Sequence, residues 1–321
     1  MARSDLLLSL VKSGIEGDQH LFRKTVEAIS AEEKVKQHYA LAERLDNLLL
    51  STTARISSIS TQDPQLQNAF YEIRPQRMLS DIILADEAYL LCREIIEEHH
   101  RKDLLRSFNL EPRHRILLSG PPGNGKTTLA EAFATELMLP FFVVKYEGIV
   151  GSLLGSTAQQ LDRLFEHVKS QRCVLFFDEF DAIGKERDDV QEVGEIKRVV
   201  NSLLKQIDML PSYVIVIGAT NHSSMLDRAV WRRFHVQIDL PLPTQKEAEK
   251  LFDLFAASFD LPFGIKSKDL AKRLEGLSFA ELEEFCLDLR RRYVLGLPDS
   301  DIKSITTTRL KIWSDRLCNK K

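Results

Sequence analysis

A glycine-rich loop that ends in lysine and threonine is the part of this sequence best suited to chemistry. Residues Gly120–Thr127 read GPPGNGKT and fit the pattern G-x-x-x-x-G-K-[ST]. The glycines let backbone N–H groups turn inward toward phosphate oxygens, and the helix expected from Leu129 adds the positive end of its dipole. Lys126 can reach the β- and γ-phosphates of a nucleotide, and the Thr127 hydroxyl can bind Mg²⁺. An ordinary glycine-rich turn is the alternative, but the apolar strand predicted just before the loop favours a phosphate site.

Two carboxylates follow a buried strand further along the chain. Four apolar residues, Val174–Phe177, precede Asp178 and Glu179, and open α/β sheets bind their ligands at the carboxyl ends of such strands. Asp178 is suited to hold Mg²⁺ through water, and Glu179 to polarise a water that attacks the γ-phosphate. Asn221 ends another apolar run, where its amide could orient that water. A helix cap or a turn is the alternative role for Asn221.

A pair of arginines, Arg232 and Arg233, stands just before the last strand candidate. Adjacent arginines usually belong to a solvated face. At this place in the chain, however, they need not face the chain's own nucleotide. An arginine supplied to the γ-phosphate of a neighbouring subunit stabilises the charge of the transition state. We therefore expect these two residues to act between subunits.

The elements that must position these residues alternate along the chain. Apolar runs rich in β-branched and aromatic residues predict five strands, at 115–119, 141–145, 173–177, 213–218 and 235–240. Helices are expected at 86–108, 129–138, 158–169 and 193–207. Strands that are apolar on both faces and separated by helices predict an α/β fold, with a five-stranded parallel sheet and helices on both faces. This large domain is expected over residues 78–243.

The flanking segments differ in character from the large domain. Residues 244–321 show no strand pattern, and two capping boxes, at 244–247 and 278–281, open amphipathic helices. They predict a small all-helical second domain. Residues 1–50 carry an apolar helical stripe and predict an N-terminal helical segment that serves oligomerisation or binds a partner or client. A stretch rich in Ser, Thr and Gln then predicts a linker over 51–77.

Taken together, these motifs resemble the AAA ATPase family of the wider AAA+ superfamily over roughly residues 78–295. The loop resembles its Walker A motif, the two carboxylates resemble its Walker B motif, and Asn221 resembles its sensor 1. Residues 219–234 resemble its second region of homology, with Arg232 and Arg233 as arginine fingers. The R-R-F form is most similar to the katanin, spastin and ESCRT-disassembly branch. The resemblance implies ATP and Mg²⁺ as cofactors, ATP hydrolysis, and a ring, usually a hexamer, with each nucleotide at a subunit interface.

The resemblance also assigns further residues to the nucleotide. Residues 81–83 resemble the segment that cradles the base, and 278–281 resemble an element of the small lid domain near the adenine. The adenine contacts implied are Asp81, Ile82 and Ala280. The residues implied in catalysis are Lys126, Glu179, Asn221, Arg232 and Arg233, and those implied in metal binding are Thr127 and Asp178. The loop contacts implied are Gly120, Pro121, Pro122, Gly123, Asn124, Gly125, Lys126, Thr127 and Thr128.

One departure from the family concerns the central pore loop. Members that thread polypeptides carry an aromatic residue there, followed by an apolar residue and glycine, whereas this chain has Leu153-Leu154-Gly155. Leucines offer a polypeptide less contact area than Trp or Tyr. Two interpretations stay open: both leucines grip a substrate in the pore, or both are packed in the core.

Composition and charge limit the remaining possibilities. The chain has 321 residues, 44% of them hydrophobic, and a net charge of −3. This charge, with no recognisable DNA-binding appendage, argues against nucleic acid as a partner. The four cysteines, Cys92, Cys173, Cys286 and Cys318, form no C-x-x-C pair, which predicts reduced, packed thiols. The apolar stretch at the N-terminus is too short for a signal peptide or a membrane span, so we expect a cytoplasmic protein.

The function predicted from these observations is ATP hydrolysis by a ring-forming AAA ATPase that remodels, unfolds or disassembles protein clients, or regulates a partner protein. The N-terminal ARSDLLLSLVKSG resembles small bacterial proteins that are paired with a subtilisin-like protease, so such a protease is a candidate partner. One alternative is a non-threading, ATP-driven switch or scaffold that releases a bound effector. The other is a nucleic-acid-linked loader ATPase, which the net charge disfavours.

Overall fold

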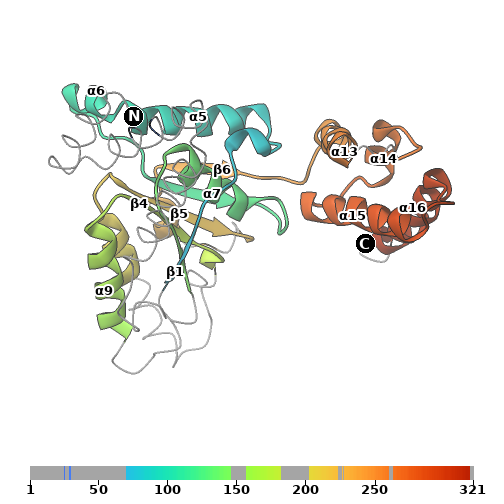
Figure 1. Ribbon diagram of the computed structural model, residues 1–321. Helices are drawn as coiled ribbons and strands as arrows, with labels where there is room; N and C mark the ends of the chain where they lie inside the picture. The colour runs from blue at the N-terminus through green and yellow to red at the C-terminus, as the bar shows by residue number, and fades with distance from the viewer. Residues whose placement is uncertain are drawn as a thin grey trace, which may run out of the picture. The chain divides into compact units, whose positions relative to one another are not determined.

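The computed structural model describes most of the chain beyond residue 69 (Figure 1). The described residues are 25, 29, 70–145, 157–181, 202–222, 226, 228–259 and 263–318. The chain divides into two units, residues 1–64 and 65–321. Of the first unit only Thr25 and Ile29 are described, and both are helical and buried. The predicted N-terminal helical segment and the pore-loop residues Leu153-Leu154-Gly155 otherwise lie outside the described residues.

The second unit is built on a six-stranded sheet. Its strands are β1 (Phe70–Ile73), β2 (Arg115–Ser119), β3 (Phe141–Val144), β4 (Cys173–Phe177), β5 (Val214–Thr220) and β6 (Val236–Asp239). They lie in the order β1-β3-β4-β5-β2-β6. The last five in this order pair in parallel, whereas β1 pairs antiparallel with β3. The five parallel strands predicted from the sequence are confirmed.

Strand β1 falls in the segment 51–77, for which the sequence predicts a linker. Of its four residues only Phe70 is buried, and its ring packs edge-on against Phe142, with 5.0 Å between the ring centroids. A short edge strand with one buried side chain carries no apolar run or clear alternation. Residues 70–73 therefore belong to the sheet rather than to a linker.

Helices and one 3₁₀ turn surround this sheet. They are η1 (Leu79–Asp81), α5 (Asp86–His100), α6 (Lys102–Ser107), α7 (Lys126–Glu136), α9 (Thr157–Lys169) and α12 (Arg228–Trp231). Residues 202–208 are also helical. The helix predicted over 86–108 is two helices, because the backbone of Arg101 leaves the helical conformation, with φ −104° and ψ 26°.

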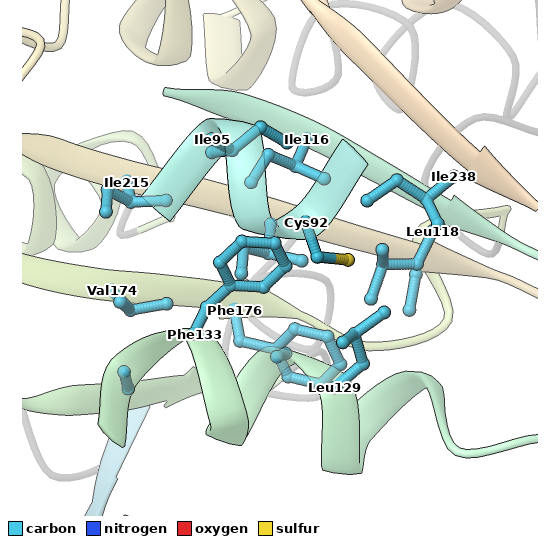
Figure 2. Close-up of a cluster of buried hydrophobic side chains, with 14 of the residues drawn as sticks. Cys92, Ile95, Ile116, Leu118, Leu129, Phe133, Val174, Phe176, Ile215 and Ile238 are labelled. Atoms are coloured by element: carbon cyan, nitrogen blue, oxygen red, sulfur yellow. The ribbon is translucent and has the colours of Figure 1, made fainter. Parts of the chain in front are cut away.

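Alternate residues of β4 enter two separate cores. Val174 and Phe176 pack in a core that α5 and α7 cover, and Figure 2 shows ten labelled members of it. These members are Cys92, Ile95, Ile116, Leu118, Leu129, Phe133, Val174, Phe176, Ile215 and Ile238. Cys173, Leu175 and Phe177 enter the other core, with side chains from α9 and from the helix at 202–208. Because both faces are buried, the sequence of the central strands is continuously apolar.

Three of the four cysteines, those whose burial the structure describes, are packed thiols, as the sequence predicts. Cys92, Cys173 and Cys286 are buried and form no disulfide. Burial raises the pKa of the Cys92 and Cys173 thiols to about 12, and it raises the pKa of the Cys286 thiol as well. A thiol with so high a pKa is a poor nucleophile at neutral pH.

Four helices form the lid after the sheet. They are α13 (Gln245–Phe259), α14 (Ser267–Arg273), α15 (Phe279–Leu295) and α16 (Ile302–Cys318). In its core Phe285 contacts the rings of Phe252 and Trp313 edge-on. Both predicted capping boxes are present: Glu247 accepts from the Thr244 N–H at 2.7 Å, and Glu281 from the Ser278 N–H at 2.9 Å. None of the helices in the described parts of the chain has the length and apolarity that crossing a membrane requires.

Candidate functional site

The loop between β2 and α7 makes two close contacts at glycines, where a side chain would have little room. Gly120 has φ +141°, and a Cβ there would lie 2.2 Å from the carbonyl oxygen of Leu240, just after β6. Gly123 has φ +78°, and its Cβ would lie 2.8 Å from Oγ of Ser278, just before α15. Such φ values strongly favour glycine. The predicted phosphate loop is therefore fixed against the end of the sheet on one side and against the lid on the other.

Lys126 begins α7 and turns back across this loop. Its Nζ donates to the carbonyl oxygen of Gly120 at 2.7 Å and to that of Pro121 at 2.9 Å. The residue is only 7% exposed. Burial lowers the pKa of Lys126, while the charges of Asp178 and Asp181 act in the opposite direction. A buried ammonium bonded to neutral carbonyl oxygens is well suited to anionic phosphate oxygens.

The two predicted carboxylates lie at the carboxyl end of β4. The Thr127 hydroxyl donates to Oδ2 of Asp178 at 3.4 Å, and the Glu179 N–H donates to Oδ1 of the same residue at 2.9 Å. Glu179 has φ +49°, so the chain turns sharply there, and both acidic residues are exposed. The hydroxyl and carboxylate oxygens are of the kind that Mg²⁺ prefers. Thr127 and Asp178 thus fit a magnesium ion.

Asn221 follows β5 and lies at the same edge of the sheet. It is supported by Asp181, a residue that sequence reasoning missed. The Asp181 carboxylate, 7% exposed, accepts the Thr220 hydroxyl at 3.1 Å and the Asn221 N–H at 3.4 Å. The only sequence signal for this role is the spacing of Asp181 three residues after Asp178, in the run D-E-F-D.

The start of α15 reaches the loop through two of its backbone N–H groups. The Ala280 N–H donates to the carbonyl oxygen of Gly123 at 2.9 Å, and the Phe279 N–H to Oδ1 of Asn124 at 3.3 Å. Asn124 also donates through Nδ2 to the carbonyl oxygen of Leu240 at 3.3 Å. One buried amide therefore joins the loop, the last strand and the lid.

These residues enclose a pocket of about 370 Å³. It is lined by Pro122, Gly123, Gly125, Lys126, Thr127, Thr128, Asp178, Glu179, Asn221, Phe279, Ala280 and Glu283. The structure thus brings most of the predicted loop, the carboxylates, the amide and Ala280 to one cavity. Gly120, Pro121 and Asn124 of the loop do not line it. Phe279, which belongs to the predicted lid element 278–281, lines it as well, and so does Glu283, to which no motif in the sequence points.

The other two residues expected at the adenine do not line this pocket. Asp81 ends η1, and its carboxylate accepts the Met78 N–H at 2.9 Å. Ile82 packs beside the core that α5 and α7 cover. The turn itself is fastened to α7, because the Leu79 N–H donates to Oε1 of Glu136 at 3.1 Å. A role for Asp81 and Ile82 at the nucleotide stays a prediction.

The two arginines lie at the opposite, amino-terminal edge of the sheet. They precede His235, whose N–H donates to the carbonyl oxygen of Arg115 at the start of β2. The loop begins after Ser119, four residues later in β2, which is roughly 13 Å away at ~3.3 Å per residue. Neither Arg232 nor Arg233 lines the pocket. An arginine side chain is too short to cross this sheet to its own loop.

The two arginines also differ from each other. Arg233 forms an ion pair with Asp208. Asp208 also pairs with a second arginine, since Nη1 of Arg115 lies 2.8 Å from its Oδ1. Arg115 in turn lies 2.7 Å, through Nη2, from Nε2 of His235. Burial, followed by the charge of Arg115, lowers the pKa of His235 to about 4. Arg232 is exposed, and no ion pair is found for it among the described residues.

Comparisons with known proteins agree with this geometry. The family profile described as ATPase family associated with various cellular activities (AAA) matches residues 116–242. An uncharacterized AAA family ATPase of Sinorhizobium fredii is 37% identical over 294 residues, which cover 89% of this chain and 88% of that protein. A putative 26S proteasome regulatory subunit homolog of Methanocaldococcus jannaschii is 31% identical, over 73% of this chain and 62% of that protein.

A proteasome-activating nucleotidase of Saccharolobus solfataricus is 32% identical, over 71% of this chain and 60% of that protein. The chain thus spans about three fifths of the length of these two archaeal relatives. The Sinorhizobium relative, by contrast, is matched over nearly its whole length. This chain belongs to the AAA family and is an ATP-binding, ATP-hydrolysing AAA ATPase.

Proposed function

We propose that this ATPase works as a ring that remodels proteins, in which each subunit completes the active site of its neighbour. The observation that carries the ring is the position of Arg232: exposed, at the amino-terminal edge of the sheet, and outside the pocket at the carboxyl edge. A solvent-facing arginine so placed can reach a phosphate only on another subunit.

Within one subunit, the pocket residues divide the work of binding and hydrolysis. Lys126 and the loop N–H groups would hold the phosphates, because the lysine can exchange the carbonyls of Gly120 and Pro121 for phosphate oxygens. Thr127 and Asp178 would hold Mg²⁺, which neutralises charge on the β- and γ-phosphate oxygens when bound. Glu179 is exposed beside them and can accept a proton from the attacking water.

Between subunits, Arg232 would supply positive charge to the γ-phosphate bound by the neighbour. Arg233, by contrast, is engaged by Asp208, which also pairs with Arg115. We therefore assign the trans role to Arg232 and a supporting role to Arg233. This assignment separates two residues that the sequence motif treats as equivalent fingers.

For the client, we propose a protein rather than a nucleic acid. Two relatives carry names that refer to the proteasome, which is a protein-degrading partner, and the net charge of this chain is −3. None of those names concerns a subtilisin-like protease, so that partner stays a prediction from the N-terminal sequence alone. The hexameric count and the katanin-like branch also stay predictions.

Mixing two inactive variants tests the ring. A Lys126→Ala subunit lacks a working pocket but keeps Arg232, whereas an Arg232→Ala subunit keeps its pocket but lacks the finger. In a mixed ring some pockets face an intact arginine, so ATPase activity should return in part. The matched control mixes Lys126→Ala with Glu179→Gln, where every subunit is defective in its own pocket. This control should stay inactive.

The result that overturns the proposal is a confirmed mixed assembly with no recovered activity, together with a monomer that hydrolyses ATP at the wild-type rate. Client capture is a second measurement. The Glu179→Gln form, held with ATP, should retain bound proteins that the Lys126→Ala form does not. Replacing Leu153 and Leu154 with Ala should abolish client remodelling but leave basal ATPase within a few-fold. Loss of folding in that double variant would instead assign both leucines to the core.

A further inference from the structure

Three hydrogen bonds fix the backbone on both sides of Asn221. The Thr220 hydroxyl donates to Oδ1 of Asp181 at 3.1 Å, and the same hydroxyl accepts the His222 N–H at 3.1 Å. The Asn221 N–H points to the same Asp181 oxygen at 3.4 Å. We call this arrangement the Asp181–Thr220 clamp. Of Thr220, Asn221 and His222, Asn221 is the residue that lines the pocket.

The fold alone does not require polar side chains at the positions of this clamp. Thr220 is fully buried and Asp181 nearly so, and a buried carboxylate is costly unless its hydrogen bonds are made. Apolar side chains of similar size could fill this space, as they do along the rest of β4 and β5. The Asp181 charge also opposes the lowering of the Lys126 pKa. The carboxylate is therefore placed where it acts on two residues of the pocket at once.

We infer that Asp181 and Thr220 are positioning residues that direct the Asn221 amide toward the reacting water. This inference rests on the function proposed above for the pocket. Asn221 follows the last residue of β5, and its own N–H is directed to the Asp181 carboxylate rather than to a neighbouring strand. An error of about 1 Å in the position of a reacting group can lower a rate roughly a hundredfold. The clamp restrains the backbone on both sides of Asn221.

A pair of substitutions at Thr220 separates the hydroxyl from the shape of the side chain. Thr220→Val keeps the volume but removes both hydroxyl bonds, whereas Thr220→Ser keeps the hydroxyl. We expect Thr220→Val to lower kcat roughly tenfold or more while the dissociation constant for ATP changes little. Thr220→Ser should stay within about threefold of the wild-type kcat. If Thr220→Val does not fold, Thr220→Ala, which also removes the hydroxyl but is smaller than threonine, answers the same question.

A double-mutant cycle then tests whether Thr220 acts through Asn221. In an Asn221→Ala background the amide is gone, so Thr220→Val should lower kcat no further. A role confined to stability would instead lower the melting temperature without this loss of additivity.

Three outcomes overturn the inference. The first is a Thr220→Val protein with wild-type kcat when Asn221→Ala is impaired. The second is equal impairment of the Val and Ser variants, and the third is full additivity in the cycle. If Asn221→Ala itself hydrolyses ATP normally, the role proposed for Asn221 in hydrolysis is wrong. The inference about the Asp181–Thr220 clamp then fails with it, because the Asn221 amide would not be needed for the reaction.

Discussion

The side-chain nitrogen of Lys126 lies 2.7 Å from the carbonyl oxygen of Gly120, at the other end of the same loop. The lysine thus spans the space that phosphate oxygens would take, and it does so from a buried position. When a nucleotide binds, the Lys126 ammonium has to give up its hydrogen bonds to the carbonyl oxygens of the loop and form new ones to phosphate oxygens. Charge at residue 126 should therefore control ATP affinity.

Replacing Lys126 with Ala should weaken ATP binding roughly ten- to hundredfold, because a charge-assisted hydrogen bond is lost. Since burial lowers the pKa of Lys126 below its ordinary 10.5, the wild-type lysine loses its proton at a lower pH than an exposed lysine. Wild-type affinity should fall accordingly as the pH is raised in the alkaline range. Lys126→Arg stays charged there, so its affinity should not fall. Fluorescent-nucleotide titrations at several pH values decide this, and parallel curves for the two proteins would contradict it.

Replacing Glu179 with Gln should leave ATP affinity nearly unchanged but lower kcat by about 10²–10⁴-fold, because an amide cannot accept the proton. Asp178→Asn serves as the comparison. It removes a metal ligand, so its defect should shrink as Mg²⁺ is raised. Steady-state ATPase assays across a range of Mg²⁺ concentrations separate the two. Rescue of the Glu179 variant by excess Mg²⁺ would show that its role is metal binding.

The two arginines should respond differently to substitution. Arg232→Ala should cost on the order of 10³-fold or more in kcat, as removal of an arginine finger does. Arg233→Ala should cost far less and should resemble Asp208→Asn, because both break the same partly exposed ion pair. The measurement is kcat at saturating ATP for the three variants in assembled protein. Equal losses at Arg232 and Arg233, with a normal Asp208→Asn form, would show that both arginines reach the phosphate.

Acid should destabilise the protein through His235. Its pKa is about 4 in the folded chain and near 6.5 when unfolded, so the unfolded chain binds more protons between these values. Stability therefore falls as the pH is lowered from about 6.5 toward about 4. His99 and His114, whose pKa values are also lowered, add in the same direction. His235→Gln keeps an acceptor for Arg115 but cannot titrate, so its melting temperature should fall less over this range. Identical losses in both proteins would remove His235 as the cause.

Gly123→Ala should disturb the contact between the loop and the lid. Its Cβ would meet Oγ of Ser278 at 2.8 Å, in addition to the strain of a positive φ, which costs about 1–2 kcal/mol. Gly276→Ala is the matched control, because φ there is +94° and its Cβ meets nothing within 4 Å. Both variants should lose stability to the positive φ, Gly123→Ala somewhat more because of its added contact, but only Gly123→Ala should lose ATP affinity. Equal affinities would mean that the lid contact does not matter for binding.

The sequence predicted the parts of this protein whose residues carry strong local patterns. The central strands are apolar on both faces, and the phosphate loop is a motif with fixed positions, so both could be recognised without a structure. Strand β1 could not be recognised, because it buries only Phe70.

Long-range partners also escaped the sequence. Asp208 pairs with Arg233, 25 residues away, and Asp181 with Thr220, 39 residues away. No local periodicity links such residues. Only the order of strands in the sheet brings them together.

The bonds of Asn124 have a consequence for how this family can diversify. This residue occupies a variable position of the loop pattern, and the chemistry of phosphate binding makes no demand on its side chain. Yet its amide ties the loop to Phe279 of the lid and to Leu240 after the last strand. A change of residue 124 can therefore loosen or tighten the contact between the loop and the lid while leaving Lys126, Thr127, Asp178 and Glu179 in place. Evolution could therefore change the strength of this loop–lid contact through residue 124 without changing a residue that takes part in hydrolysis.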